Sequence, residues 1–270
     1  MDLEMALALL LVGLLGLCSA QPGHNHGDFS ELSKDTPGRG DITRTILTMN
    51  NGSSEFLEGD VILPKSRSAL KCTSHSYSCL WPKSSNGKVE IPYVLSDKYD
   101  STELSEILRA LKDFEMKTCI RFVPRQKETA YLNFEPRYGC ASLLGRIGDK
   151  QLVTLQRFGC VQLGIIQHEV MHALGFHHEH NRSDRDQYVR INWDNIMSSF
   201  SYNFEKADTD NLATPYDYSS IMHYSKDAFG KNWADTITPI PNPNVQIGQR
   251  DRLSDLDVLR INHLYRCWGY

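Results

Sequence analysis

The chain has 270 residues, of which 40% are hydrophobic, and a formal net charge of −4 at pH 7. This length allows one large domain or two small ones, and the composition is ordinary for a globular protein. The weak charge argues against nucleic acid or an anionic membrane as a partner.

The N-terminus has the pattern of a secretory signal peptide. Met5–Leu17 is almost wholly apolar, and the small residues Cys18-Ser19-Ala20 precede a cleavage point at Gln21. The run is shorter than the roughly 20 apolar residues that cross a bilayer, which disfavours the alternative of a membrane anchor. No later stretch is apolar enough to span. We therefore predict a signal peptide over residues 1–20 and a secreted protein without a membrane partner.

Residues 21–67 are polar, rich in Gly, Ser and Asp, and free of cysteine. They show little amphipathic pattern, which predicts a weakly structured pro-segment. The segment ends at Pro64-Lys65-Ser66-Arg67, where an exposed arginine would be a target for a trypsin-like protease. Cleavage after Arg67 would start the mature chain near Ser68, so we expect residues 68–270 to form the mature domain.

Hydrophobic periodicity predicts the elements of this domain. From Thr102 onward, apolar residues recur at three- and four-residue spacing, as on one face of a helix. Gly175 follows a second such segment in the manner of a helix C-cap. The predicted strands are Glu90–Leu95, Cys119–Val123, Ala130–Phe134 and Gln151–Gln156. The predicted helices are Thr102–Lys117, Leu163–Leu174 and Ser254–Tyr265.

The cysteines indicate disulfides. Cys18 would leave with the signal peptide, and an even number would remain in a secreted chain, which predicts three disulfides. The spacing alone leaves their pairing open. No Cys-x2-Cys pair occurs, which disfavours a zinc site built from cysteine. The remaining cysteines are Cys72, Cys79, Cys119, Cys140, Cys160 and Cys267.

One dense histidine motif, His-Glu-Val-Met-His, begins at His168. On a helix, His168 and His172 lie one turn apart on the same face, so both imidazoles can bind one metal ion. Gly175 can adopt a left-handed conformation that turns the chain back and brings in His178 as third ligand. Three protein ligands and one open position are typical of a catalytic zinc site. Glu169 would take a proton from the attacking water and deliver it to a leaving amine.

Three other interpretations of the motif compete at this point. The histidines could pack as a cluster on a buried helix, the chain could be a catalytically inactive zinc-binding module, or the zinc could be structural. The extended spacing disfavours the first interpretation, and the presence of Glu169 disfavours the other two. His177 and His180 fall outside the ligand positions, and we expect them to be surface or packing residues.

The stretch His168–His178 resembles the signature of the metzincin metalloproteases, and its continuation Glu179–Asp186 resembles the astacin family in particular. Other segments that match the astacin family are Phe114–Pro124, Ser220–Tyr224 and Leu253–Cys267. The resemblance covers essentially residues 89–267. It implies a zinc endopeptidase with an α+β fold in two lobes. The N-terminal lobe would hold a mixed, twisted sheet and two long helices, and the irregular C-terminal lobe a terminal helix.

The resemblance also implies roles for residues outside the histidine motif. Met222 would form the hydrophobic base under the zinc. Tyr224 would be an additional ligand that swings off the metal to hydrogen-bond the oxyanion, and would be catalytic together with Glu169. Glu179 would meet the new amino terminus once the pro-segment is cut. The implied zinc ligands, for one ion per subunit, are His168, His172, His178 and Tyr224.

Within the pro-segment, Phe56–Asp60 resembles the family's inhibitory segment. Asp60 is expected to replace the catalytic water on the zinc in the zymogen, because a carboxylate is a good zinc ligand. Gly59 would let the backbone approach the cleft closely. The alternative is that Asp60 is one of several acidic residues in a solvated segment.

The family's disulfide pattern implies the pairs Cys119–Cys267 and Cys140–Cys160, and leaves Cys72 with Cys79. The extra N-terminal pair marks the six-cysteine astacins of fishes, and the run Cys79–Gly87 resembles their hatching enzymes. The resemblance implies egg-envelope glycoproteins as substrate, an activating trypsin-like protease, and a monomer that is secreted, with storage in secretory granules. The alternative is an astacin-type protease of another tissue, such as blood-forming tissue.

Two local features leave questions open. Gly148-Asp149-Lys150 stands where many relatives carry two glycines before the edge strand that pairs with substrate backbone, so the geometry of that strand is in question. Asn51-Gly52-Ser53 and Asn181-Arg182-Ser183 are sequons for N-glycosylation, whose use the sequence does not decide.

Overall fold

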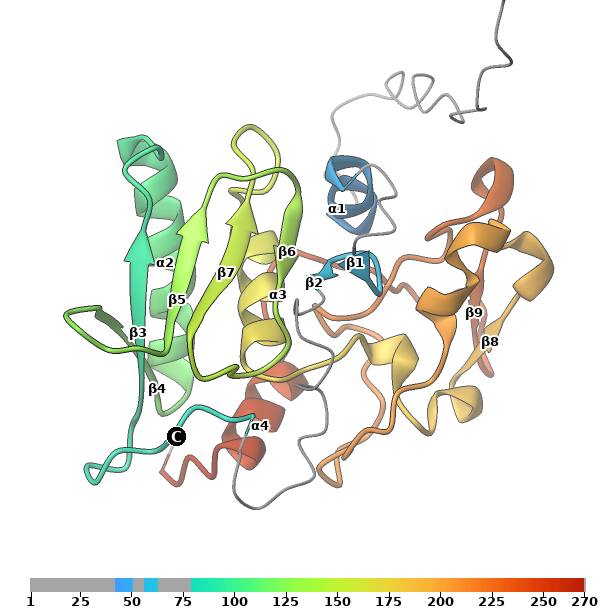
Figure 1. Cartoon of the computed structure of the whole chain (residues 1–270). Helices are drawn as coiled ribbons and strands as arrows, with labels where there is room; N and C mark the ends of the chain where they lie inside the picture. The colour runs from blue at the N-terminus through green and yellow to red at the C-terminus, as the bar shows by residue number, and fades with distance from the viewer. Residues whose placement is uncertain (1–41, 51–55, 63–78, 270) are drawn as a thin grey trace, which may run out of the picture. The chain divides into compact units, whose positions relative to one another are not determined.

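The computed structural model describes residues 42–50, 56–62 and 79–269, all of which belong to the unit Pro37–Tyr270 (Figure 1). The expected signal peptide over residues 1–20, the cleavage site at Arg67, Cys72 and the sequon at Asn51 lie outside the described residues. No helix of the described part is long and apolar enough to cross a membrane.

Seven strands form one mixed sheet: β1 (Phe56–Leu57), β2 (Val61–Ile62), β3 (Val89–Leu95), β4 (Ile120–Pro124), β5 (Tyr131–Glu135), β6 (Cys140–Ser142) and β7 (Lys150–Leu155). Their order across the sheet is β1-β2-β6-β7-β5-β3-β4. β3 pairs in parallel with β4 and β5, and β5 pairs in parallel with β7. β6 is antiparallel to β7 and parallel to β2. The four strands predicted from the sequence match β3, β4, β5 and β7 to within one residue at each end.

Two long helices, α2 (Ser101–Lys117) and α3 (Leu163–Ala173), cover one face of this sheet (Figure 1). α2 begins at a capping box formed by Asp100 and Glu103, and its apolar stripe is buried. α3 is buried from Gly164 to Ala173, so its polar side chains need partners inside the protein. The helices predicted from the sequence match α2, α3 and α4 (Asp255–Leu264) to within one residue at each end.

The part of the chain that follows Glu179 is largely irregular. It contains a small antiparallel sheet of β8 (Val189–Ile191) and β9 (Ile237–Pro239). Its 3-10 helices are Glu179–Asn181, Arg185–Gln187, Trp193–Asn195, Ser198–Phe204 and Lys231–Trp233. One hydrophobic core lies among the large sheet, α2, α3 and α4, and a second gathers Phe204, Tyr216, Tyr224 and Phe229. The two cores confirm the predicted α+β fold in two lobes.

The prediction of a weakly structured pro-segment is wrong for its described part. Ile42–Met49 forms the helix α1, and β1 and β2 follow it. Ile46 is 1% exposed within the first core, and Leu47 packs against the second. An eight-residue helix is marginal in water by itself, so α1 owes its stability to this packing. The helix has only about two turns, too few for a hydrophobic pattern in the sequence to reveal it.

The expectation that Asp149 precedes the edge strand of the sheet is wrong. Asp149 precedes β7, which is an interior strand because β6 and β5 flank it. The strand that borders the N-terminal residues is β6, whose Ser142 is in register with Val61. Because β6 has three residues, no hydrophobic run marks it in the sequence. The Asp149 side chain accepts a hydrogen bond from the backbone N–H of Lys150 at 2.7 Å, so it caps the start of β7.

Two disulfides of the described residues join distant elements. Cys119–Cys267 connects the start of β4 to the end of the chain after α4, across 148 residues of sequence. A loop of this size contributes about 4–5 kcal/mol on the chain-entropy account. Cys140–Cys160 connects β6 to the segment before α3. The Cys72–Cys79 pair includes a residue outside the described part and stays a prediction.

The sequon at Asn181 is buried. Its side chain is 1% exposed, and its amide nitrogen donates to the carbonyl oxygens of Asn203 at 3.0 Å and Glu205 at 2.6 Å. A glycan on this nitrogen would need both bonds to break and the side chain to leave the interior. The folded domain therefore excludes glycosylation at this site.

Candidate metal centre

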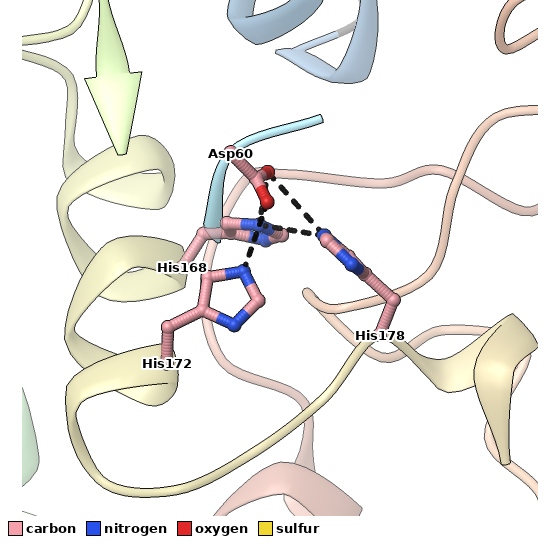
Figure 2. A group of neighbouring side chains, drawn as sticks. All are labelled: Asp60, His168, His172 and His178. Carbon is pink, nitrogen blue, oxygen red and sulfur yellow. Dashed lines mark hydrogen bonds and ion pairs between the residues drawn. The ribbon is translucent and has the colours of Figure 1, made fainter. Parts of the chain in front are cut away.

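α3 presents His168 and His172 to the same side, one helical turn apart (Figure 2). The helix ends at Ala173 with Leu174 as its C-cap, and Gly175 follows with a φ of +105°, a conformation that glycine adopts without steric cost. The chain then turns and places His178 opposite the two helical histidines. All three imidazoles are at most 1% exposed.

Asp60 completes a four-residue cluster with these histidines (Figure 2). Its Oδ2 lies 3.1 Å from Nε2 of His168 and 3.3 Å from Nε2 of His178, and its Oδ1 lies 3.2 Å from Nε2 of His172. The Nε2 atoms of His168 and His178 are 3.2 Å apart. Tetrahedral zinc with Zn–N distances near 2.0–2.1 Å separates neighbouring ligand atoms by about 3.3 Å. Two of the Asp60 contacts use Oδ2 and the third uses Oδ1, and all four spacings are close to the edge of such a tetrahedron.

The outer ring nitrogens fix the tautomers of the three histidines. Nδ1 of His168 lies 2.8 Å from the carbonyl oxygen of Ile221, and Nδ1 of His172 lies 2.8 Å from that of Phe176. Nδ1 of His178 lies 3.0 Å from a carboxylate oxygen of Glu58. These oxygens can only accept, so each Nδ1 carries a hydrogen and each Nε2 is left to face the cluster.

Such a buried cluster is suited to a cation. Nε2 of His172 and Oδ1 of Asp60 are buried and have no hydrogen-bond partner among the described residues. Burial opposes charge on His178, but Asp60 and Glu58 raise the pKa of His178 to about 9. Burial instead lowers the pKa of His168 to about 3, so that imidazole stays neutral and keeps a free lone pair. Three imidazoles and one carboxylate are ligands that suit a divalent metal, so the residues present fit such an ion.

The turn between β1 and β2 aims Asp60 at the histidines. Glu58 and Gly59 both have positive φ values, 51° and 80°. A Cβ on Gly59 would lie 2.9 Å from side-chain atoms of both Leu47 and Phe229, so only glycine fits there. The side chain of Asn50 fastens the turn to β6, because it donates at 2.8 Å to the carbonyl oxygens of Gly59 and of Cys140.

Glu58 touches three groups of the site, and sequence reasoning missed it. One carboxylate oxygen lies 2.8 Å from Nδ1 of His177, while the other lies 3.0 Å from Nδ1 of His178. The carbonyl oxygen of Glu58 accepts a hydrogen bond from the hydroxyl of Tyr224. The Tyr224 ring also packs on His180, with centroids 3.9 Å apart. The available signal was the position of Glu58 within the Phe56–Asp60 segment, but nothing in the sequence indicated which residues it would contact.

Glu169 lies on α3 directly after His168 and is fully buried. Neither of its carboxylate oxygens accepts a hydrogen bond from any residue that the structure describes. Burial raises the pKa of Glu169 well above its usual value, and the charge of Asp60 adds to the effect. Two buried acceptors without protein donors indicate a place for water or another small donor.

Asp257 of α4 holds the turn that supports His168. Its carboxylate accepts from the Ser220 hydroxyl at 2.6 Å and from the backbone N–H of Ile221 at 2.9 Å. The carbonyl oxygen of the same Ile221 is the acceptor for Nδ1 of His168. Met222 follows in this turn and is buried in the first core. One carboxylate of the terminal helix thus orients the His168 imidazole through a single residue, Ile221.

Arg260, one turn further along α4, holds the residue after His178. Its guanidinium donates to the two carboxylate oxygens of Glu179, at 2.6 Å and 2.9 Å. Glu179 also accepts from the backbone N–H of Asp217 at 2.7 Å, and its own N–H donates to the carbonyl oxygen of Met222 at 3.0 Å. Glu179 is 3% exposed, so this is a buried, fully bonded ion pair. Its role toward a new amino terminus stays a prediction.

A helical histidine pair, a third histidine after a glycine turn and an acid beside the first histidine define the chain as a metallopeptidase of the His-Glu-x-x-His class. A family model described as Astacin, a family of peptidases, matches residues 77–266. The chain therefore belongs to the astacin family, and it is a zinc metalloendopeptidase that acts on protein substrates.

Similar proteins come from the medaka fish, Oryzias latipes. The chain is 56% identical to its low choriolytic enzyme and 50% identical to its high choriolytic enzyme 1, over 99% of this chain and 100% of each relative. A solved structure of high choriolytic enzyme 1, described as a hatching enzyme zinc-protease, superposes with a TM-score of 0.70. That comparison covers 74% of this chain and 99% of the solved one, at 56% identity.

Proposed function

We propose that His168, His172 and His178 hold one zinc ion per subunit, and that Asp60 is the fourth ligand until the pro-segment is removed. The observation that carries this proposal is the convergence of three buried Nε2 atoms and one carboxylate at the spacings of a zinc tetrahedron. Their outer nitrogens are all bonded, which supports a preorganised ligand set.

Bound zinc would polarise the scissile carbonyl and acidify the attacking water. Glu169 would accept the proton of that water and return it to the leaving amine, a role that suits its two unbonded oxygens. Tyr224 donates to Glu58 in the full-length chain. When Glu58 leaves with the propeptide, the Tyr224 hydroxyl would be free to bind the metal weakly or to hydrogen-bond the oxyanion in the transition state.

Latency would rest on the N-terminal segment. In this proposal residues 1–20 are a signal peptide, residues 21–67 the propeptide and residues 68–270 the catalytic domain. A trypsin-like cut after Arg67 would release Asp60 from the histidines and β2 from β6, which opens the edge of the sheet to substrate backbone. The new amino terminus near Ser68 would join the buried cluster of Glu179 and Arg260.

The proposed substrate is the glycoprotein of the egg envelope. Support comes from the two choriolytic relatives, which align with this chain over their whole length at 56% and 50% identity. We further propose that the enzyme is secreted from storage granules and acts as a monomer. An astacin-type protease of another tissue is the alternative, because the metal centre alone does not distinguish substrates.

The test uses isolated egg envelopes and the activated protein, with Glu169→Gln as the matched control. We expect the wild-type enzyme to release soluble envelope fragments and the control to release none. An enzyme that cuts peptides readily yet leaves envelopes intact would favour the alternative tissue. An activated, zinc-loaded enzyme that cuts neither would contradict the assigned chemistry of the site.

A further inference from the structure

Arg44 of α1 contacts Asp227 and Trp233, two residues that follow Tyr224 in the chain. Its Nη2 lies 2.8 Å from Oδ2 of Asp227, and its guanidinium carbon lies 4.2 Å from the ring centroid of Trp233. A carboxylate at one edge and an aromatic face together form a receptor for a planar cation. Both groups belong to the part of the chain that remains after a cut at Arg67.

The receptor is built into its loop independently of Arg44. The hydroxyl of Ser225 donates to Oδ1 of Asp227 at 3.0 Å, which leaves Oδ2 turned toward the guanidinium. Trp233 and Asn232 both have left-handed backbone conformations, with φ values of 63° and 51°. Trp233 is 51% exposed even with Arg44 beside it. Backbone strain of this kind clusters at functional sites, so Trp233 is a candidate for one.

The neighbouring lysines do not compete for this receptor. The ammonium of Lys226 donates to the carbonyl oxygen of Pro243 at 2.6 Å. The ammonium of Lys231 donates to the carbonyl oxygen of Asp194 at 2.9 Å. Asp227 therefore faces the site with its negative charge available to a cation from outside the loop.

The receptor lies close to the metal centre. Leu47, one helical turn after Arg44, contacts the position of Gly59, which Tyr224 and Phe229 also border. One turn separates side chains by about 5–6 Å. Asp227 lies two residues before Phe229, so the receptor and the Gly59–Asp60 turn share a border that an extended peptide bound at the metal could also reach.

We propose that Asp227 and Trp233 form a substrate subsite for a cationic side chain, arginine above lysine, which Arg44 fills in the full-length chain. The inference rests on the proposed function and adds a substrate class to it. Removal of the N-terminal segment would open the subsite together with the cleft. Arginine is preferred over lysine because a planar guanidinium can stack on the indole while it binds the carboxylate.

The test compares peptides that carry arginine or its uncharged isostere citrulline at each position around the cut bond, with the activated enzyme. At one position near the bond, arginine should raise kcat/KM about tenfold over citrulline, as expected for a half-exposed ion pair with a cation–π contact. Asp227→Asn should bring this ratio close to one, and Trp233→Leu should lower it. Asp235→Asn, an acid of the same loop, should keep the wild-type ratio.

Each other outcome counts against the subsite. Equal cleavage of every arginine and citrulline peptide by the wild-type enzyme would overturn it and leave the protease function intact. A ratio lost equally in Asp227→Asn and Asp235→Asn would mean a general charge effect and would also overturn it. Failure of the zinc-loaded enzyme to cut any peptide would instead overturn the proposed function, and the subsite with it.

Discussion

At the scale of residues, the site depends on a few positions where only one side chain fits. Gly59 brings the backbone against Leu47 and Phe229, and this close approach lets Asp60 reach the histidines. The three histidines were predictable because their spacing is local to one helix and the turn after it. The contact of Glu58 with His178 was not, because 120 positions separate the two residues and no pattern links them.

We expect the substitution Asp60→Ala to raise the activity of an uncut chain. In an Arg67→Gln background, which blocks the proposed cleavage, loss of the carboxylate removes one charged contact to the buried histidines. Loss of such a contact should raise the peptidase activity of the uncut chain by about 10–100-fold. The measurement is peptide hydrolysis before any protease is added. Adding Glu169→Gln to the same chain should abolish the gain in activity. If the Asp60→Ala chain and its parent were equally inactive, the proposed role of Asp60 as a zinc ligand in the uncut chain would be contradicted.

We expect Glu169→Gln to keep its zinc and lose at least about 100-fold in turnover, because general acid–base catalysis contributes on that order. The two measurements are metal content by atomic absorption and kcat of the activated enzyme. Glutamine preserves the shape of the buried side chain, so the fold should be unchanged. A variant that retains kcat within a few-fold would remove Glu169 from the mechanism.

At the scale of elements, α4 holds residues of the candidate metal centre but contributes none of the four clustered side chains. Asp257 holds the Ile221 residue that orients His168, and Arg260 holds the residue after His178. Periodicity predicted this helix to within one residue, but its function depends on partners 36 and 81 positions away. For the same reason β6 and the α1–β2 segment escaped prediction, since their stability comes from packing and not from local pattern.

We expect Asp257→Asn to weaken zinc binding by about 10–100-fold, the usual effect of losing an outer partner of a metal-bound histidine. The measurement is competition for zinc with a chromophoric chelator, made on the activated enzyme. Asp255→Asn is the matched control, because Asp255 lies in the same helical turn and is exposed. Equal zinc affinities for the two variants would show that α4 does not act on the metal.

At the scale of the whole molecule, the described N-terminal segment joins the two cores. Ile46 is buried in the first core, Leu47 packs on the second, and Thr43 accepts a hydrogen bond from Arg250 at 2.9 Å. β2 extends the sheet next to β6, at the edge where substrate backbone would bind. Removal of this segment would therefore free the metal, the sheet edge and the Asp227–Trp233 subsite together. The sequence indicated the four residues of the candidate metal cluster, but not the helix that holds the segment in place.

The most direct test of the account is the zinc coordination of the full-length chain, measured by anomalous diffraction at the zinc edge. We expect one zinc ion, bound by Nε2 of His168, His172 and His178 and by a carboxylate oxygen of Asp60, each at about 2.0–2.2 Å. The activated enzyme should keep the three histidine bonds and lose the bond to Asp60. A full-length chain whose zinc carries water in place of Asp60, or whose metal lies elsewhere, would contradict the central claim.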